Sequence, residues 1–448
     1  MLTVGLDFGT SNSSIALYRD EKIHLFDLDP ANINPKMLRS IIFIDRQHQS
    51  FVGAEAINRY VELETGRAVY WERRQIGQLK MVVGGAGSGP IIYWDDLMVD
   101  IDLNAQGRLL QSIKTGLRNP AYEGTEIFEQ QYNIENMIAI LLQTLRERCE
   151  SATGERVSRA MIGRPVRFSD DRETDARAQA KIEQAAHLAG FEEVDFELEP
   201  VAAAYVHHKS VGGRENALVF DFGGGTLDFT VIEVGGDTPP RPLATYGILL
   251  GGDDFDRALM QPLKKYLGEG ASMRDRTPFP AHMLYKLDSW QTMVMLSRPE
   301  YKPIFRSALR GSDPTAIKRL ETLVNHNLGF ELFQQLEQAK IELSTDATGT
   351  VKMEAHGFRL REMFTRPQFE RLIAADVARV EDAIDEVLRL SGLRPDQIHS
   401  ILRTGGSSEI PIFNRMLTRK FSYEKIQALS PFATIVGGLA IKASEWKN

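Results

Sequence analysis

The stretch VFDFGGGTLDFT, residues 219–230, is the part of the sequence that decides the fold. Its two apolar runs flank three consecutive glycines, a pattern that predicts a strand, a tight turn and a second strand. Glycines allow positive φ and let backbone N–H groups approach an anion with no Cβ in the way. Asp221 and Asp228, one on each side of the turn, carry the hard oxygen ligands that Mg²⁺ prefers. Taken alone, the stretch is typical of either a plain turn or a phosphate site.

A second copy of this pattern lies near the N-terminus, in LDFGTSNSSIAL at residues 6–17. Asp7 aligns with Asp221, and Gly9 with Gly223, at one offset of 214 residues. An internal repeat of that length indicates two related lobes that face each other. Two hairpins that each carry an aspartate are then expected to hold a polyphosphate and its metal between them.

The composition of the chain limits the classes of protein to which it can belong. The chain has 448 residues, of which 43% are hydrophobic and 25% charged, as in an ordinary soluble globular protein of two lobes. Its net charge of −8 argues against a nucleic-acid-binding surface. Cys149 is the only cysteine, so no intramolecular disulfide is possible and a reducing compartment fits. No run approaches the ~18 apolar residues of a membrane span, and we expect a cytoplasmic protein without membrane contact.

Hydrophobic periodicity predicts alternating strands and helices, with no clear period between residues 54 and 133. Strands are predicted at residues 2–8, 15–18, 23–26, 40–44, 157–162, 194–198, 217–221, 227–234, 243–249 and 400–403. Helices are predicted at residues 133–150, 171–189, 200–208, 253–267, 330–343, 367–390, 411–420 and 432–444.

Four further motifs occur in the chain. They are EPVAAA (199–204), LGGDDFD (250–256), LEQAKIELS (336–344) and TGGSSEIP (404–411). With the two hairpins, they make the chain resemble the actin-type ATPase superfamily and, within it, the nucleotide-binding domain of the DnaK-type, seventy-kilodalton heat-shock chaperones. The motifs stand in the family's order and span almost the whole chain. The likeness is greatest to the short YegD-like branch, whose members are described as chaperone-like.

The resemblance implies an α/β, actin-like ATPase fold with two lobes related by the internal repeat and a nucleotide cleft between them. Lobe I is expected at residues 1–211, with an inserted subdomain at about 36–130. Lobe II is expected at residues 212–448, with an inserted subdomain at about 257–330. No C-terminal peptide-binding domain is expected to follow.

The resemblance also implies that ATP or ADP binds with Mg²⁺, for which Asp7 and Asp221 are the expected ligands. Glu199 is expected to contact the water around the metal, and Asp228 to orient the attacking water or accept its proton. The residues with expected catalytic roles are Lys114, Glu199, Asp221, Thr226 and Asp228. The residues expected to hold the phosphates are Gly9, Thr10, Ser11, Asn12, Gly223, Gly224 and Gly225.

A lysine near the γ-phosphate has two candidates, Lys114 and Lys80. We favour Lys114, because its flanking residues resemble the short branch more closely. A lone lysine is otherwise most often a solvated surface charge.

The resemblance implies that the nucleoside lies against one helix face and two glycine-containing turns. The expected contacts are Glu337, Lys340, Ser344, Gly251, Gly252, Gly405, Gly406 and Ser407. The sequence departs from the family at Glu409, where an arginine normally covers the adenine. The loss of a cation–π contact worth ~1 kcal/mol is expected to weaken nucleotide affinity or base preference.

The leading hypothesis is a chaperone-like ATPase with slow turnover, whose lobes move with nucleotide state and whose partners are client proteins or a co-chaperone. The rival hypotheses are a small-molecule kinase on the same fold, a cytoskeletal ATPase that polymerises, and a nucleotide-dependent binding protein without turnover.

Overall fold

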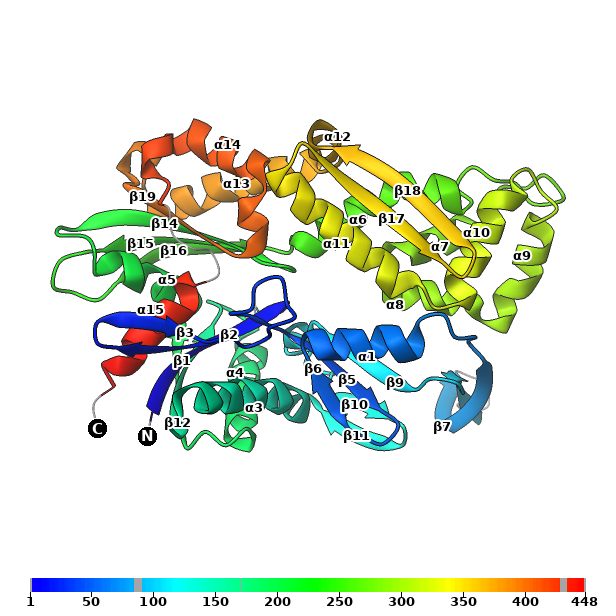
Figure 1. Ribbon diagram of the computed structural model, residues 1–448, viewed down its shortest axis with the longest axis horizontal. Helices are drawn as coiled ribbons and strands as arrows, with labels where there is room; N and C mark the ends of the chain where they lie inside the picture. Colours follow the sequence, from blue (N-terminus) through cyan, green and yellow to red (C-terminus); the bar gives the residue numbers. More distant parts are fainter. Residues whose placement is uncertain (1, 84–90, 170, 428–432, 447–448) are drawn as a thin grey trace.

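A computed structural model describes residues 2–83, 91–169, 171–427 and 433–446 (Figure 1), with the backbone alone at residues 76–83 and 91–98. The strands are β1 (Leu2–Phe8), β2 (Asn12–Arg19), β3 (Lys22–Leu25), β4 (Leu38–Arg39), β5 (Ile41–Asp45), β6 (Ser50–Val52), β7 (Trp71–Val83), β8 (Ile91–Asp102), β9 (Gly107–Gln111), β10 (Gly124–Ile127), β11 (Gln130–Asn133), β12 (Val157–Arg164), β13 (Glu193–Leu198), β14 (Glu215–Phe222), β15 (Leu227–Val234), β16 (Arg241–Ile248), β17 (Thr348–Ala355), β18 (Phe358–Thr365) and β19 (Ser400–Thr404).

The α-helices are α1 (Ala54–Glu64), α2 (Ile113–Gly116), α3 (Ile134–Thr153), α4 (Arg172–Leu188), α5 (Glu199–His208), α6 (Gly252–Met260), α7 (Ala281–Tyr285), α8 (Trp290–Met293), α9 (Lys302–Ala308), α10 (Pro314–Asn325), α11 (Gly329–Thr345), α12 (Arg366–Leu372), α13 (Ala374–Ser391), α14 (Pro411–Phe421) and α15 (Thr434–Ser444). The 3₁₀ helices are η1 (Gln261–Leu267), η2 (Lys286–Asp288), η3 (Val294–Ser297), η4 (Pro299–Tyr301), η5 (Pro395–Gln397), η6 (Gly406–Glu409) and η7 (Tyr423–Lys425).

Two sheets repeat one connectivity. In the first, strands run in the order β13-β12-β1-β2-β3, with β1 antiparallel to β2 and parallel to β12. In the second, the order is β16-β15-β14-β19, with β14 antiparallel to β15 and parallel to β19. Asp7 pairs with Ser14 at the end of one hairpin, and Asp221 with Asp228 at the end of the other. The α/β fold and the internal repeat are therefore confirmed.

Helices α5 and α15 pack against each other between the two sheets (Figure 1). Their residues share one buried cluster with Val219 of β14 and Met161 of β12. A Cβ on Gly438 of α15 would lie 1.7 Å from the carbonyl oxygen of Ala202 on α5, so only glycine permits this crossing. Because α15 also packs on β1 and β2, the C-terminal helix adjoins the sheet of the first repeat.

The outer parts of the two halves also touch. Tyr60 of α1 packs against Phe330 of α11, with ring centroids 5.0 Å apart, and against Trp290 of α8 at 5.8 Å. Trp71 donates through Nε1 to the hydroxyl of Ser297 at 2.8 Å. The cleft between the halves is thus bounded by α5 and α15 at one end and by this aromatic contact at the other. The lobe boundary at residue 211 stays a prediction.

The prediction was incomplete in several regions, among them residues 281–325, where the helices α7 to α10 were not predicted. Residues 54–133 contain α1, α2 and several strands, most of them short and half-exposed, so their periodicity is weak. The hairpin β17–β18 was not predicted; its turn is His356-Gly357, both with positive φ. The expected helix at residues 367–390 is divided into α12 and α13 at Ile373. The glycine-rich stretch GGAGSGP at residues 84–90 lies outside the described residues.

The glycine at the helix crossing yields a stability prediction. We expect Gly438→Ala to lower the free energy of unfolding by about 2–3 kcal/mol, because the added methyl collides with backbone that cannot move aside. The matched control is Gly437→Ala, whose Cβ would meet only the mobile end of the Ile23 side chain, at 2.9 Å. Urea unfolding followed by circular dichroism measures both. Equal stability of the two variants would contradict the account of the crossing.

Candidate functional site

The two repeated hairpin turns face each other and line one pocket. The lining contains Asp7, Gly9, Thr10, Ser11, Asn12, Lys114, Arg118, Pro165, Glu199, Asp221, Gly223, Gly224, Thr226, Asp228, Gly405 and Gly406. Gly224 lies so close to Ser11 that a Cβ would stand 2.1 Å from its hydroxyl. The fold therefore brings the expected metal ligands, most of the expected phosphate contacts and all the expected catalytic residues together.

The glycines of the second hairpin allow other segments of the chain to pack closely against the turn. None of Gly223, Gly224 and Gly225 has a positive φ, so the sequence-based reason for their presence was wrong in that part. A Cβ on Gly251 would stand 2.1 Å from the Gly224 carbonyl oxygen, and the Gly252 N–H donates to the Gly223 oxygen at 3.1 Å. The start of α6 therefore packs against the glycine turn and holds it in place.

A second loop supports the same turn. Gly405 has φ +79°, and a Cβ there would lie 2.2 Å from the Phe222 carbonyl oxygen. The Ser407 hydroxyl donates to the Gly223 oxygen at 3.0 Å. Gly251, Gly252 and Ser407 therefore hold the glycine turn in place, whereas Gly405 and Gly406 line the pocket itself.

Four carboxyl groups crowd this pocket. Desolvation first, and then the charge of Glu199, raise the pKa of Asp7 to about 7 and that of Asp228 to about 6. The same two causes, in the same order, raise the pKa of Asp221 well above its ordinary value. The Thr226 hydroxyl donates to Asp228 and lowers its pKa. These hard oxygen donors fit a hydrated divalent cation, because its charge would relieve their mutual repulsion.

Lys114 reaches the carboxyl groups from the turn of α2. Its Nζ donates to Glu199 Oε1 at 2.8 Å, and its charge lowers the pKa of Asp7 and Asp221. The turn follows Ser112, whose φ of +57° is unusual for a residue other than glycine. Lys80 belongs to β7, and its side chain lies outside the described residues.

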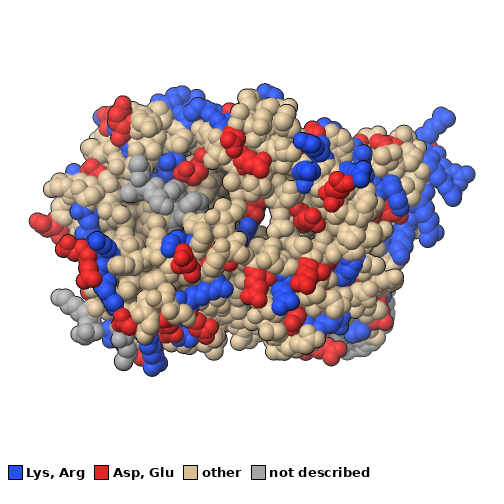
Figure 2. Space-filling model, viewed as in Figure 1, with Lys and Arg blue, Asp and Glu red and all other residues tan. Residues whose placement is uncertain are grey.

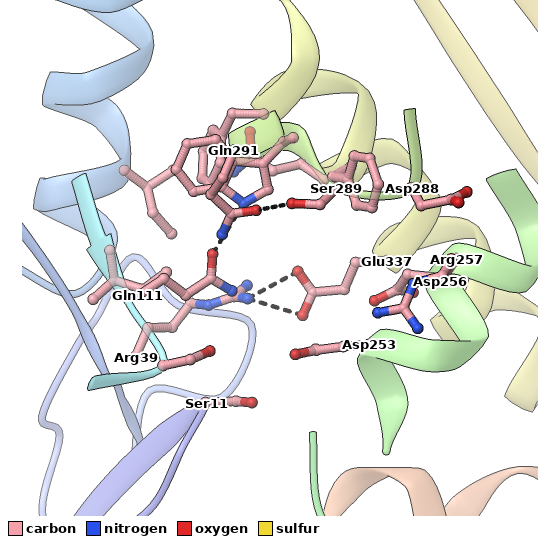
Figure 3. Close-up of a pocket in the computed structure, with 17 residues that line it drawn as sticks. Ser11, Arg39, Gln111, Asp253, Asp256, Arg257, Asp288, Ser289, Gln291 and Glu337 are labelled. Carbon is pink, nitrogen blue, oxygen red and sulfur yellow. Dashed lines mark hydrogen bonds and ion pairs between the residues drawn. The ribbon is translucent and has the colours of Figure 1, made fainter. Parts of the chain in front are cut away.

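A second pocket begins beyond Ser11, which lines both, and lies between the halves (Figure 3). Glu337 of α11 points across it and accepts two hydrogen bonds from Arg39 of β4, at 2.8 and 2.9 Å. The side chains of Arg39 and Glu337 are 18% and 33% exposed, so the ion pair is partly screened from solvent. This contact joins residues of the two halves.

The other residues expected around the nucleoside point elsewhere. Lys340 donates to Asp256 at 2.9 Å and to the Gly252 carbonyl at 3.0 Å, while the Ser344 hydroxyl donates to the Lys340 carbonyl of its own helix. Ser344 lines neither of these two pockets. Glu409 forms an ion pair with Arg403 at 3.2 Å.

Arg39 and Arg118 are among the charged residues of these pockets that sequence reasoning missed. Arg39 carried no signal, since its partner Glu337 lies about three hundred residues away along the chain. Arg118 follows Lys114 by four residues, a spacing that places two side chains on one helical face. That spacing was the available signal.

Comparison with known families fits this geometry. A family model described as Hsp70 protein matches residues 3–276 and 318–446. The chain belongs to the Hsp70 family. Hsp70 proteins are ATPases that generally bind ATP or ADP with Mg²⁺, and client proteins with co-chaperones. Membership makes this chain a chaperone-like, ATP-binding protein. Among its described helices, none is long and apolar enough to cross a membrane.

The raised pKa of Asp221 predicts a pH-dependent stability. Without ligand, the folded state holds the Asp221 proton more tightly than the unfolded chain, so stability falls as pH rises from near 4 through the raised folded pKa. We expect Asp221→Asn, which carries no charge, to raise Tm by a few degrees at pH 8 and hardly at pH 5. Differential scanning fluorimetry without nucleotide or Mg²⁺ measures this, with the exposed Asp20→Asn as control. A gain that is the same at both pH values would contradict it.

The ion pair between Arg39 and Glu337 predicts a kinetic effect. We expect Arg39→Ala to speed release of fluorescent ADP about 5–30-fold, because a charge-assisted contact worth about 1–2 kcal/mol across the cleft, from Nη2 to both carboxylate oxygens, is lost. Stopped-flow displacement by excess ATP measures the rate. Arg59→Ala, which removes an exposed arginine of α1, is the control. Unchanged release from Arg39→Ala would show that the ion pair does not hold the cleft closed.

Proposed function

We propose that the protein hydrolyses ATP slowly to ADP and phosphate in the cleft between its two hairpins. One observation carries the proposal: both repeated aspartates, Asp7 and Asp221, line a single pocket with Glu199, Asp228 and the glycine turn. Phosphoryl transfer depends on positioning and charge neutralisation more than on covalent chemistry. Hydroxyls and backbone N–H groups would position the phosphates, and Lys114 and the divalent cation held by the carboxylates would neutralise their charge.

Each residue of the pocket has a task in this proposal. Asp7 and Asp221 would hold hydrated Mg²⁺, which neutralises phosphate charge when it is bound. Thr10, Ser11 and Asn12 would donate to the phosphates from one side, and the turn from Gly223 to Thr226 from the other. Lys114 is held by Glu199 and would act beside the γ-phosphate.

Asp228 is the proposed orienter of the attacking water. Its pKa of about 6 leaves it ionised at neutral pH, so its carboxylate accepts a hydrogen bond from water and receives the proton as the water attacks. Thr226 supports it by donating to the same carboxylate. Glu199 is the first residue of α5, the helix that crosses α15, and its side chain accepts a hydrogen bond from Lys114.

Lobe movement with nucleotide state is also part of the proposal. The crossing of α5 and α15 is the natural pivot, because it lies between the two sheets and excludes side chains at Gly438. The Arg39–Glu337 pair and the contact of Tyr60 with Phe330 would separate as the cleft opens. Glu199 would couple the phosphates to this pivot.

We further propose that the protein belongs to the YegD-like branch, acts in the cytoplasm and binds client proteins or a co-chaperone. A reducing compartment is consistent with the single cysteine, Cys149, because the chain can form no intramolecular disulfide. On the face in Figure 2, basic and acidic side chains of the described residues are interspersed, which favours protein partners over nucleic acid. Residues 277–317, outside the family match, are the proposed client or partner surface.

Single-turnover cleavage of γ-labelled ATP at saturating Mg²⁺ tests the proposal. We expect label in inorganic phosphate from the wild type, and a loss of at least 100-fold in Asp221→Asn and Lys114→Ala, because each loses a charge beside the phosphates. Asp20→Asn, on the turn between β2 and β3, and Lys22→Ala, at the start of β3, both change exposed residues and are matched controls.

The other outcomes separate the rival functions. Label that passes to an added small molecule would make the protein a kinase. Tight binding without cleavage would make it a nucleotide-dependent binding protein and would refute the hydrolytic mechanism. Sedimentation that depends on ATP would indicate a polymerising ATPase.

A further inference from the structure

Arg118 lines the pocket between the two hairpins, and its positive charge has no ion-pair partner among the described residues. It shares the pocket with Lys114, Thr226 and Asp228, and its charge lowers the pKa of Asp228. Among the residues that the structure describes, its guanidinium makes no hydrogen bond and no ion pair within 4.0 Å. An arginine in a pocket of carboxyl groups would ordinarily pair with one of them.

The local fold explains why Arg118 faces the pocket. Ile113 and Leu117 are buried on the protein side of the α2 turn. Lys114 and Arg118 are four residues apart, so they share another face of the turn, and both line the pocket. The turn continues past α2, since the Arg118 N–H donates to the Thr115 carbonyl at 3.2 Å. The two cations are therefore held side by side on one short, anchored segment.

Arg118 is available to bind a ligand, because the other charged groups of the pocket have partners or proposed roles. Lys114 is already paired with Glu199 at 2.8 Å, so its charge is offset within the protein. Asp7 and Asp221 are the proposed ligands of a divalent cation. Arg118 is left as the free donor next to Asp228, where the attacking water is expected. A planar guanidinium with several free N–H donors matches the oxygens of a phosphate group, which it binds in a bidentate manner.

We propose that Arg118 binds the terminal phosphate of ATP and stabilises the charge that develops on it during hydrolysis, an assignment that rests on the proposed function. In that step the water oxygen forms a bond to the γ-phosphorus, and the bond from this phosphorus to the β–γ bridging oxygen breaks. The bridging oxygen keeps the electron pair and leaves as part of ADP, while the water proton passes to Asp228. Arg118 keeps its proton throughout and contributes only charge and hydrogen bonds.

The experiment compares two nucleotides that differ in the terminal phosphate. Isothermal titration with Mg²⁺ measures the Kd of ADP and of the non-hydrolysable AMP-PNP for wild type, Arg118→Ala and Arg118→Lys. We expect Arg118→Ala to weaken AMP-PNP binding at least 10-fold and to leave ADP binding within twofold. Arg118→Lys restores part of the affinity, because it keeps the charge but loses the bidentate fork. Single-turnover cleavage falls at least 100-fold in Arg118→Ala.

Controls separate this assignment from a structural effect. Arg108→Ala removes an exposed arginine of β9 that donates to the Glu126 carbonyl outside the pocket, and it should change neither Kd. The melting temperatures of unliganded Arg118→Ala and Arg118→Lys should match that of the wild type. Equal losses for ADP and AMP-PNP, or no loss for either, would overturn the role of Arg118 while the wild type still binds nucleotide. A wild type that binds neither nucleotide would overturn the proposed function and this assignment together.

Discussion

The structure depends on holding Asp7, Asp221, Asp228 and Glu199 close together against their mutual repulsion. Among the residues that the structure describes, only Lys114 forms an ion pair with this set, through Glu199. Desolvation by burial first, and then the charge of Glu199, raise the pKa values of the three aspartates, and these shifts are the electrostatic cost of the arrangement. The free energy of a bound cation and its phosphates offsets that cost, so the same repulsion that destabilises the free protein favours ligand binding.

The rest of the fold keeps these groups in place. Each repeated sheet contributes one hairpin with an aspartate at its end, and the two hairpins meet because α5 and α15 pack tightly between the sheets. Glycine permits the close contacts at Gly438 and Gly224, where any side chain would collide with backbone or with Ser11. The site is thus built on strands and helices that tertiary packing fixes, as preorganised phosphate chemistry requires.

Much of the fold could be predicted from the sequence, because β1, β2, β14 and β15 are apolar runs that are largely buried. The hairpin β17–β18 was missed although its sequence carries the signal of a half-buried hairpin, because its charged residues alternate with buried ones on both sides of the turn His356-Gly357. At the site, the repeat predicted that Asp7 and Asp221 meet. It gave no information on side-chain partners: Glu337 faces Arg39 across the cleft, and Lys340 is paired with Asp256 within its own half. Such pairings depend on tertiary packing, which local sequence patterns do not encode.

The central claim is that two hairpins from related halves of the chain hold one metal–phosphate group. A double-mutant cycle on the Mg²⁺ dependence of ATP binding, with Asp7→Asn, Asp221→Asn and both together, tests it most directly. If both aspartates hold the same ion, each single variant loses most of the Mg²⁺-dependent gain in affinity and the double variant loses little more. Losses that simply add, or a full Mg²⁺ effect that survives in either single variant, would show that the two hairpins do not share an ion and would contradict the account.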